Sequence, residues 1–412
     1  MFRPSLALLP VVLAVCLAGC HRFPHHVLPP APQFRPDKLA EIDAAILASI
    51  AEGQTPGGVL WLERRGGAYH KAFGARAVEP VREPMTEDTI FDAASLTKVI
   101  ATTTAVMKLV EQGRIDVEAP VRRYLPEFAA NGKEAVTVRQ LLTHVSGLPP
   151  GLSLQKEWTG RDAAIAHACA EKLVEPPGTK SRYSDVNFIL LGEIVRRVAG
   201  EPLDRFCARE VFGPLGMKDT GFRPFDPAVA VAFTAAGSGR IAPTEHRAEG
   251  LLRGVVHDPT SRRMGGVAGH AGLFTTANDL ARFARMMLGG GELDGRHILR
   301  PATVKLMTAV QSPPGLARRG FGWDIDSPYA GPRGAHFPIG SFGHTGWTGT
   351  SLWIDPFSGT SVVFVANRNH PTEAGNVIAL RRKLGTLAAE AVRDFDFTHV
   401  AGALPPDPAS SR

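Results

Sequence analysis

A serine followed three residues later by a lysine, Ser95-Leu96-Thr97-Lys98, is the first stretch of this sequence that could do covalent chemistry. The apolar residues after it recur at helical spacing and stop before Gly113: Leu96, Val99, Ile100, Val106, Met107 and Val110. Ser95 and Lys98 would then share a face at the N-terminus of a helix, where free backbone N–H groups and the helix dipole stabilise an oxyanion. If burial lowers the pKa of Lys98, its amine can take the proton of the serine hydroxyl.

The same pattern occurs again at Ser153-Leu154-Gln155-Lys156, after a Gly/Pro-rich stretch that predicts a loop. No helix would hold that lysine, so we interpret the second copy as a chance match. For Ser95 the alternative is a helix-capping serine beside a surface lysine. The sequence contains no G-x-S-x-G, H-E-x-x-H or G-x-x-x-x-G-K-[ST] pattern, so three common enzyme classes lose their usual signature.

Two further motifs favour catalysis at Ser95. Tyr183-Ser184-Asp185 directly precedes an amphipathic stretch that ends at Gly200, which predicts a phenol on a loop rather than on the buried face of a helix. His344-Thr345-Gly346 lies before the β-branched run 350–354, in a glycine-dense loop where backbone can approach a ligand closely.

The elements that must position these residues are predicted by periodicity. The chain opens with a predicted helix (37–52) and two strands (57–63, 70–74), and it closes with two strands (350–354, 361–366) and a helix (376–392). Between them lie predicted helices at 96–112, 138–142, 161–173, 186–199, 203–212, 278–288 and 301–308. This order predicts an α/β (α+β) fold: an antiparallel sheet formed by the N- and C-terminal segments, flanked by helices, with an inserted mostly helical lobe. The site would lie between the two lobes.

The order S-x-x-K, Y-x-[ND], [KH]-T-G at wide spacing resembles the serine β-lactamase and penicillin-binding protein superfamily. The class C-like branch, which also holds esterases, D-aminopeptidases and cell-wall recycling amidases, is the most similar. Flanking segments match as well: 91–98, 141–148, 183–187, 269–274 and 343–349. The likeness covers about residues 40–393 and implies a β-lactamase/transpeptidase-like fold.

The resemblance also implies roles for individual residues. Ser95 would be the acylated nucleophile, Lys98 its proton acceptor or relay, and Tyr183 the base that also activates the deacylating water. The backbone N–H groups of Ser95 and Trp347 would form the oxyanion hole. The substrate-binding residues would be Asp185, His344, Thr345 and Gly346.

Two positions depart from the β-lactamases of this branch, which typically carry Asn in the second motif and Lys in the third. Asp185 can only accept hydrogen bonds, and His344 is mostly neutral above about pH 6.5. Both changes weaken the capture of a β-lactam's amide and carboxylate. We therefore expect negligible turnover of the β-lactam nitrocefin.

The expected function is that of a membrane-tethered serine hydrolase acting on a peptidoglycan-derived amide or ester, as a muropeptide amidase, carboxypeptidase or esterase. The alternatives are a class C-type β-lactamase, a sensing or binding lipoprotein that acylates without turnover, and a structural wall-associated lipoprotein. No cofactor or metal is expected, because His257, Asp258 and His270 are more typical of hydrogen-bonded loop structure. His144 is interpreted as a hydrogen-bonded loop histidine.

The ends of the chain indicate export. Arg3 and the apolar run 6–18 are typical of a secretory signal, and Leu17-Ala18-Gly19-Cys20 resembles the lipoprotein cleavage box. Residues 1–19 would be removed, Cys20 would carry the lipid, and His21 in place of Asp favours the periplasmic face of the outer membrane. Residues 20–36 are rich in proline and form a predicted semi-extended tether.

Residues 37–400 are the predicted catalytic domain, with an α/β lobe at about 37–94 and 318–394 and a helical lobe at about 95–317; residues 401–412 are a predicted flexible tail.

The chain's 46 basic and 40 acidic residues give a net charge of +6 without a basic block, so no nucleic-acid partner is expected. A disulfide between Cys169 and Cys207 is possible, but their apolar surroundings favour buried thiols. The oligomeric state stays open.

Overall fold

The computed structural model describes residue 1 and residues 33–226, 239–248 and 250–406. The chain divides into two units, Met1–Ala31 and Pro32–Arg412, and the second is the folded body. The predicted signal peptide, Cys20 and most of the predicted tether lie outside the described residues. No helix of the described residues is long and apolar enough to cross a membrane.

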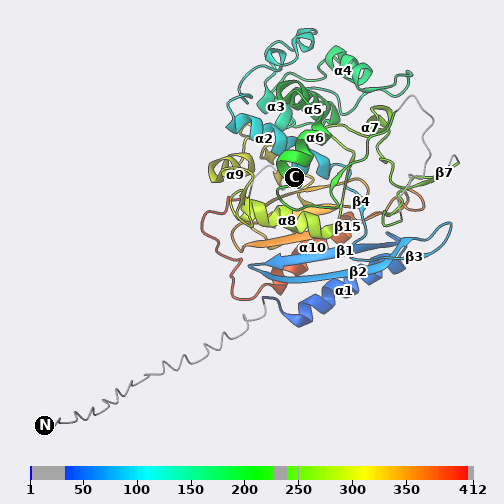
Figure 1. Cartoon of the computed structure of the whole chain (residues 1–412), viewed down its shortest axis with the longest axis vertical. Coiled ribbons are helices and arrows are strands. Elements are labelled where there is room, and N and C mark those ends of the chain that lie inside the picture. Colours follow the sequence, from blue (N-terminus) through cyan, green and yellow to red (C-terminus); the bar gives the residue numbers. More distant parts are fainter. Residues whose placement is uncertain (2–32, 227–238, 249, 407–412) are drawn as a thin grey trace. The chain divides into compact units, whose positions relative to one another are not determined.

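One large antiparallel sheet is the centre of the fold. Its strands in spatial order are β11 (Arg318–Arg319), β12 (Asp324–Asp326), β13 (Phe342–Thr345), β14 (Ser351–Asp355), β15 (Thr360–Ala366), β1 (Gly57–Arg64), β2 (Gly67–Ala77) and β3 (Glu83–Pro84). In Figure 1 the blue strands β1 and β2 lie beside the orange strand β15. The register runs from Gly58 opposite Ala366 to Arg64 opposite Thr360. The predicted sheet of N- and C-terminal segments is therefore confirmed.

Helices cover both faces of this sheet, which explains why β1 and β15 are buried along almost their whole length. On one face lie α1 (Pro36–Ala51) and α10 (Ile378–Ala391), and on the other lies α8 (Ala277–Leu288). Neighbouring strand residues point into different cores, since side chains alternate along a strand. Leu60 packs in the core beneath α1 and α10, whereas Val59 belongs to the larger core on the other face.

The inserted segment is mostly helical, as predicted. Its helices are η1 (Lys98–Thr103), α2 (Thr104–Glu111), η2 (Val121–Arg123), η3 (Pro126–Ala129), α3 (Val138–Leu142), α4 (Arg161–Ala170), α5 (Asp185–Ala199), α6 (Leu203–Cys207), η4 (Ala208–Phe212), α7 (Pro259–Arg263) and α9 (Pro301–Thr308), and η5 (Gly331–Arg333) follows in the sheet lobe. Short strands that the periodicity did not predict accompany them: β4 (Phe91–Asp92), β5 (Gly221–Phe222), β6 (His246–Arg247), β7 (Gly250–Leu251), β8 (Leu273–Thr275), β9 (Glu292–Leu293) and β10 (Arg296–His297).

The folded body extends slightly beyond the predicted domain at both ends. Residues 33–36 were predicted to belong to the tether but are part of this body, because buried Phe34 pairs with Val392 and the Arg35 N–H donates to the Ala391 carbonyl at 2.8 Å. In the predicted tail, the Leu404 N–H donates to the Ile339 carbonyl at 2.8 Å. Residues 407–412 lie outside the described part.

Candidate active site

Ser95 stands on a turn between β4 and η1 that the backbone holds in an unusual shape. Ala94, just before it, has a φ of 46°, in the left-handed region that non-glycine residues seldom adopt. Buried Asp92 stabilises this turn: one carboxylate oxygen accepts from the Ala94 N–H at 2.9 Å, and the other accepts from the His257 N–H at 2.7 Å. Strain of this kind persists only where surrounding contacts determine it. The turn therefore fixes the direction in which Ser95 points.

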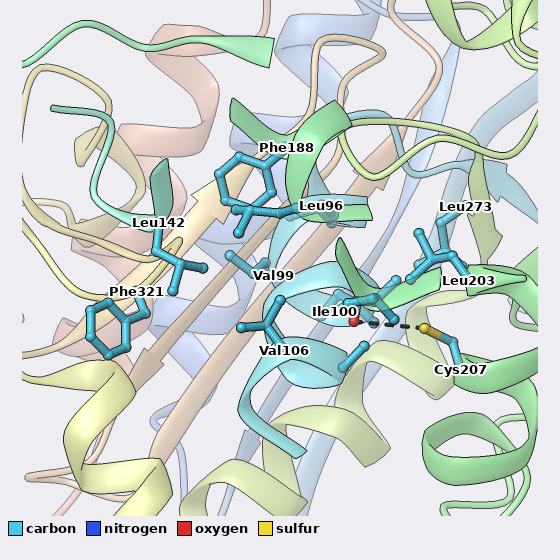
Figure 2. Close-up of a cluster of buried hydrophobic side chains, with 14 of the residues drawn as sticks. Leu96, Val99, Ile100, Val106, Leu142, Phe188, Leu203, Cys207, Leu273 and Phe321 are labelled. Atoms are coloured by element: carbon cyan, nitrogen blue, oxygen red, sulfur yellow. Dashed lines mark hydrogen bonds between the residues drawn. The ribbon is translucent and has the colours of Figure 1, made fainter. Parts of the chain in front are cut away.

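The helical segment after Ser95 is anchored in the larger core (Figure 2). Leu96, Val99 and Ile100 are fully buried. Their neighbours come from several separate segments: Leu142, Phe188, Leu203, Cys207, Leu273 and Phe321. Residues 98–103 form wide π-helical turns rather than the regular helix predicted, a distortion often found at functional sites. This packing leaves the Lys98 side chain little freedom.

Lys98 lies at the centre of the site and is fully buried. Its ammonium donates to Ser95 Oγ at 2.9 Å and to the His270 carbonyl at 3.0 Å, and it lies 2.7 Å from Asp185 Oδ1. Tyr183 lies within hydrogen-bonding reach of the same ammonium. Burial lowers the pKa of Lys98, but the Asp185 carboxylate and Tyr183 raise it more, so the pKa lies above its ordinary value. The condition under which Lys98 could accept the serine proton directly, a pKa lowered by burial, is therefore not met, because the Asp185 counter-ion opposes burial.

Tyr183 lies on the loop just before α5, as the sequence predicted. The Lys98 ammonium is 4.9 Å from the centre of its ring. Burial raises the pKa of Tyr183. The charge of Lys98 and the hydrogen bonds with Lys98 and Ser95 lower this pKa, but by less, so it lies above its ordinary value. The phenol is therefore protonated at rest and stands within hydrogen-bonding reach of both the serine and the lysine.

His144 supports Tyr183 from behind. Its buried ring stacks on the Tyr183 ring with centroids 4.5 Å apart, and its Nδ1 accepts from the Ser184 N–H at 3.1 Å. Burial, together with nearby Arg319, Lys98 and His344, holds the pKa of His144 well below its usual range. This agrees with a neutral, hydrogen-bonded loop histidine.

The first two residues of the third motif lie on a strand, whereas the sequence placed the motif in a loop. His344 and Thr345 end β13 and pair with Leu352 and Ser351 of β14. Burial lowers the pKa of His344 to about 4, against the opposing effect of Asp324, so the ring is neutral at physiological pH. Its Nδ1 lies 2.8 Å from the Thr345 carbonyl and must carry the proton, which leaves Nε2 as an acceptor without a partner in the described residues.

The loop after this motif is fastened to the turn that carries Ser95. The Thr348 hydroxyl donates to the Asp92 carbonyl at 2.7 Å, and the Thr350 hydroxyl donates to the Ala93 carbonyl at 2.9 Å. The backbone N–H groups of Ser95 and Trp347, one on each segment, donate to no other described residue. Two unpaired amides on joined segments can stabilise an oxyanion.

Two groups of acidic and histidine side chains have the spacing of metal ligands: Asp185, Asp258 and His270, and Glu245, His257 and Glu373. The cation of the first group is Lys98, and His270 Nε2 is hydrogen-bonded to Asp258 at 2.9 Å. In the second group, His257 lies between the two carboxylates, and Arg247 pairs with Glu245 at 2.7 Å. Side chains of both groups thus have charged or hydrogen-bonding protein partners.

The other candidates lie elsewhere. Ser153 accepts from the Gln155 N–H in an exposed loop, which fits the chance match predicted. Cys169 and Cys207 are buried free thiols, as their apolar surroundings in the sequence favoured. A cavity of about 600 Å³ beside α4 and α5 is lined by Glu127, Arg197 and Cys169 among others, and by no residue of the predicted site.

Comparison with known proteins identifies the family. The Beta-lactamase family profile matches residues 42–386. N-acetylmuramyl-L-alanine amidase of Bacillus subtilis is 33% identical over 84% of this chain and 85% of its own, and a putative D-alanyl-D-alanine carboxypeptidase of Escherichia coli is 31% identical over 82% and 84%. A penicillin-binding protein homologue from Caulobacter crescentus superposes with a TM-score of 0.69 at 26% identity, covering 87% of this chain and 98% of that one. The chain is therefore a serine hydrolase that belongs to the β-lactamase family.

Proposed function

We propose that this protein cleaves an amide bond of peptidoglycan fragments through an acyl-enzyme on Ser95, as an N-acetylmuramyl-peptide amidase. Ser95 is the nucleophile, Lys98 the proton relay and Tyr183 the acid and base. The oxyanion of the tetrahedral intermediate is held by the backbone N–H groups of Ser95 and Trp347. The contacts among Ser95, Lys98 and Tyr183 support these roles.

The proton path follows from the charges at rest. Lys98 is protonated and Tyr183 is neutral, so neither can accept the serine proton until it has given up its own. As Ser95 Oγ attacks the carbonyl carbon, its proton passes to Lys98, Lys98 passes one to Tyr183, and Tyr183 delivers one to the leaving nitrogen. Asp185 keeps the relay cationic by its ion pair at 2.7 Å. In deacylation Tyr183 takes a proton from water, and the same path returns one to Ser95.

One observation favours an amidase over a carboxypeptidase or a β-lactamase: three basic side chains of the site, Lys98, Arg319 and His344, offer no unpaired charge. Lys98 is paired with Asp185, buried Arg319 is paired with Asp324, and His344 is neutral. A D-alanyl carboxypeptidase must hold the free carboxylate next to its scissile bond, and a β-lactam carries a carboxylate too. An amide between a sugar acid and a peptide has no charge at that point. The relative from B. subtilis supports this choice.

The experiment is incubation of the purified enzyme with N-acetylmuramyl-peptides, D-alanyl-D-alanine peptides and short-chain esters, followed by mass spectrometry. We expect free peptide from the first substrate, little D-alanine from the second, and no product from a Ser95→Ala variant. Ser153→Ala is the matched control and should behave like the unaltered enzyme. Release of D-alanine with muropeptides left intact would overturn the assignment.

A sensor that acylates without turnover gives a different result in a simple assay. A fluorophosphonate probe would label Ser95 in an enzyme and in a sensor alike, and ester hydrolysis then separates them. Sustained p-nitrophenyl ester turnover supports the enzyme, while one burst without a steady state supports the sensor.

We also propose that a lipid at Cys20 tethers the protein to the periplasmic face of the outer membrane. The support is the box Leu17-Ala18-Gly19-Cys20 after an apolar run, with His21 following. A Cys20→Ala protein should leave the membrane fraction. Retention of that variant in the membrane would contradict the anchor.

A further inference from the structure

Large aromatic side chains are exposed at two places in the described part of the chain, and both belong to the active site. Trp347 is 62% exposed and Tyr329 is 49% exposed. Every other described Trp, Tyr and Phe is buried or half-buried. Trp347 follows the third motif directly and supplies a proposed oxyanion amide, and the Tyr329 ring lies 5.3 Å from the ring of Tyr183. Each exposed ring thus lies next to one of the motifs of the site, where a bound substrate can cover it.

The Trp347 indole is fixed although it is exposed. The Arg368 guanidinium covers one face at 4.5 Å from the ring centre, and its Nε donates to the Trp347 carbonyl at 2.7 Å. The indole N–H donates to Glu373 Oε1 at 2.9 Å, and Asn369 Nδ2 donates to the same oxygen at 3.3 Å. A flat apolar face held still in this way binds a ligand without the entropy cost of ordering a loose side chain.

Tyr329 lies beside the second motif, and hydrogen bonds hold its backbone. Its N–H donates to Ser327 Oγ at 3.1 Å, and that hydroxyl donates to buried Asp324 at 2.7 Å. One aromatic wall thus adjoins the amide of the third motif, and the other adjoins the phenol of the second motif. A substrate whose carbonyl lies at Ser95 passes between these two motifs.

We propose that Trp347 and Tyr329 form a subsite for a pyranose ring, so that the enzyme recognises the sugar of its substrate by stacking. A pyranose has apolar C–H faces and polar edges. The Trp347 face matches the apolar faces of the ring, and the exposed carboxylate of Glu373 beside the indole edge matches the polar edges. A plain alkyl chain would leave the Glu373 carboxylate facing apolar surface. This inference rests on the proposed amidase function and names what that site selects.

The test compares two substrates with the same scissile amide and no charge beside it: N-acetylmuramyl-L-alaninamide, and N-lactyl-L-alaninamide, which lacks the ring. We expect kcat/KM to favour the sugar substrate by about tenfold or more in the unaltered enzyme, mostly through KM. Trp347→Ala and Tyr329→Ala should each reduce that ratio, and Trp347→Phe should restore part of it. Leu47→Ala removes an exposed apolar side chain from α1 and is the matched control.

The ratio of kcat/KM for the two substrates distinguishes recognition of the sugar ring from a purely structural role of Trp347. If Trp347→Ala lowered kcat/KM equally for both substrates, the indole would only position the oxyanion loop, and the subsite would be refuted. Calorimetric titration of N-acetylmuramyl-L-alaninamide into Ser95→Ala protein separates this inference from the function. Binding that weakens about tenfold in Ser95→Ala/Trp347→Ala supports the subsite even if the unaltered enzyme cleaves nothing, while binding equal in both proteins overturns it.

Discussion

Gly346 offers a direct test of the oxyanion loop. It follows β13 and packs against the turn that carries Ser95. Its φ lies outside the left-handed region, so an alanine there is allowed by the backbone and is opposed only by space. A Cβ at Gly346 would lie 2.1 Å from Thr350 Oγ1, 2.5 Å from the Ala93 carbonyl oxygen and 3.2 Å from Ala94 Cβ.

The size of the effect follows from these distances. Real Cβ contacts essentially never fall below 3.0 Å, so the new methyl group must move about 0.9 Å from Thr350 Oγ1 and about 0.5 Å from the Ala93 oxygen. Those two atoms are hydrogen-bonded to each other at 2.9 Å, so neither can yield alone. The displacement therefore passes to the neighbouring Trp347 amide. A misplacement near 1 Å costs about 10²-fold in rate, and losing an oxyanion donor costs about 10²–10³-fold.

We therefore expect Gly346→Ala to lower kcat/KM for p-nitrophenyl acetate about 10²-fold. Gly151→Ala is the matched control, because a Cβ there has nothing within 4 Å and no left-handed φ. Gly346→Ala/Thr350→Ala removes the closer contact and should recover part of the rate. Thermal unfolding by circular dichroism checks that the variants are folded. Turnover within threefold of the unaltered enzyme, in folded Gly346→Ala protein, would refute the reasoning.

Three further outcomes are expected. Asp185→Asn removes the largest effect that raises the pKa of Lys98, while the lowering effect of burial remains. The relay needs a protonated Lys98, so the fall of kcat/KM at alkaline pH should move to lower pH. pH–rate profiles of both enzymes check this, and a move to higher pH would count against the ion pair. Leu96→Ala should lower the free energy of unfolding, measured in urea, by about 2–5 kcal/mol, because Leu96 is fully buried. The control Leu47→Ala, at an exposed position, should lower it by about 0.5 kcal/mol or less. Similar losses in the two variants would mean that Leu96 is not packed as described. Nitrocefin turnover should be negligible because Lys98 and Arg319 are paired with carboxylates and His344 is neutral. Vigorous hydrolysis that vanishes in Ser95→Ala would contradict this reason.

The sequence predicted those parts of the molecule that local patterns determine. The helix at α1 and the strands β1, β14 and β15 follow from periodicity, because each element has one constant environment along its length. Strand β13 was missed, since its sequence Phe342-Gly343-His344-Thr345 is short and contains glycine, and its strand form depends on pairing with β14.

The same limit applies to the site. The motifs identified Ser95, Lys98 and Tyr183 as residues that could act together, and the structure brings them together. The protonation of Lys98 could not be predicted, because it depends on a contact at 2.7 Å with Asp185, across segments distant in sequence. The aromatic pair was missed for the same reason: exposure of Trp347 and Tyr329 is a property of the folded surface.

The pairing of β1 with β15 has a consequence for biogenesis. Gly58 and Ala366 are neighbours in the sheet but stand about 300 residues apart along the chain. Strand β1 therefore cannot pair with β15 until almost the entire polypeptide has been made, and closing so long a loop slows folding. The same late segment supplies β13 and the oxyanion loop after it. A chain that lacks this segment therefore contains Ser95 but not the Trp347 amide of the oxyanion hole. Catalytic competence thus arises only when synthesis is complete.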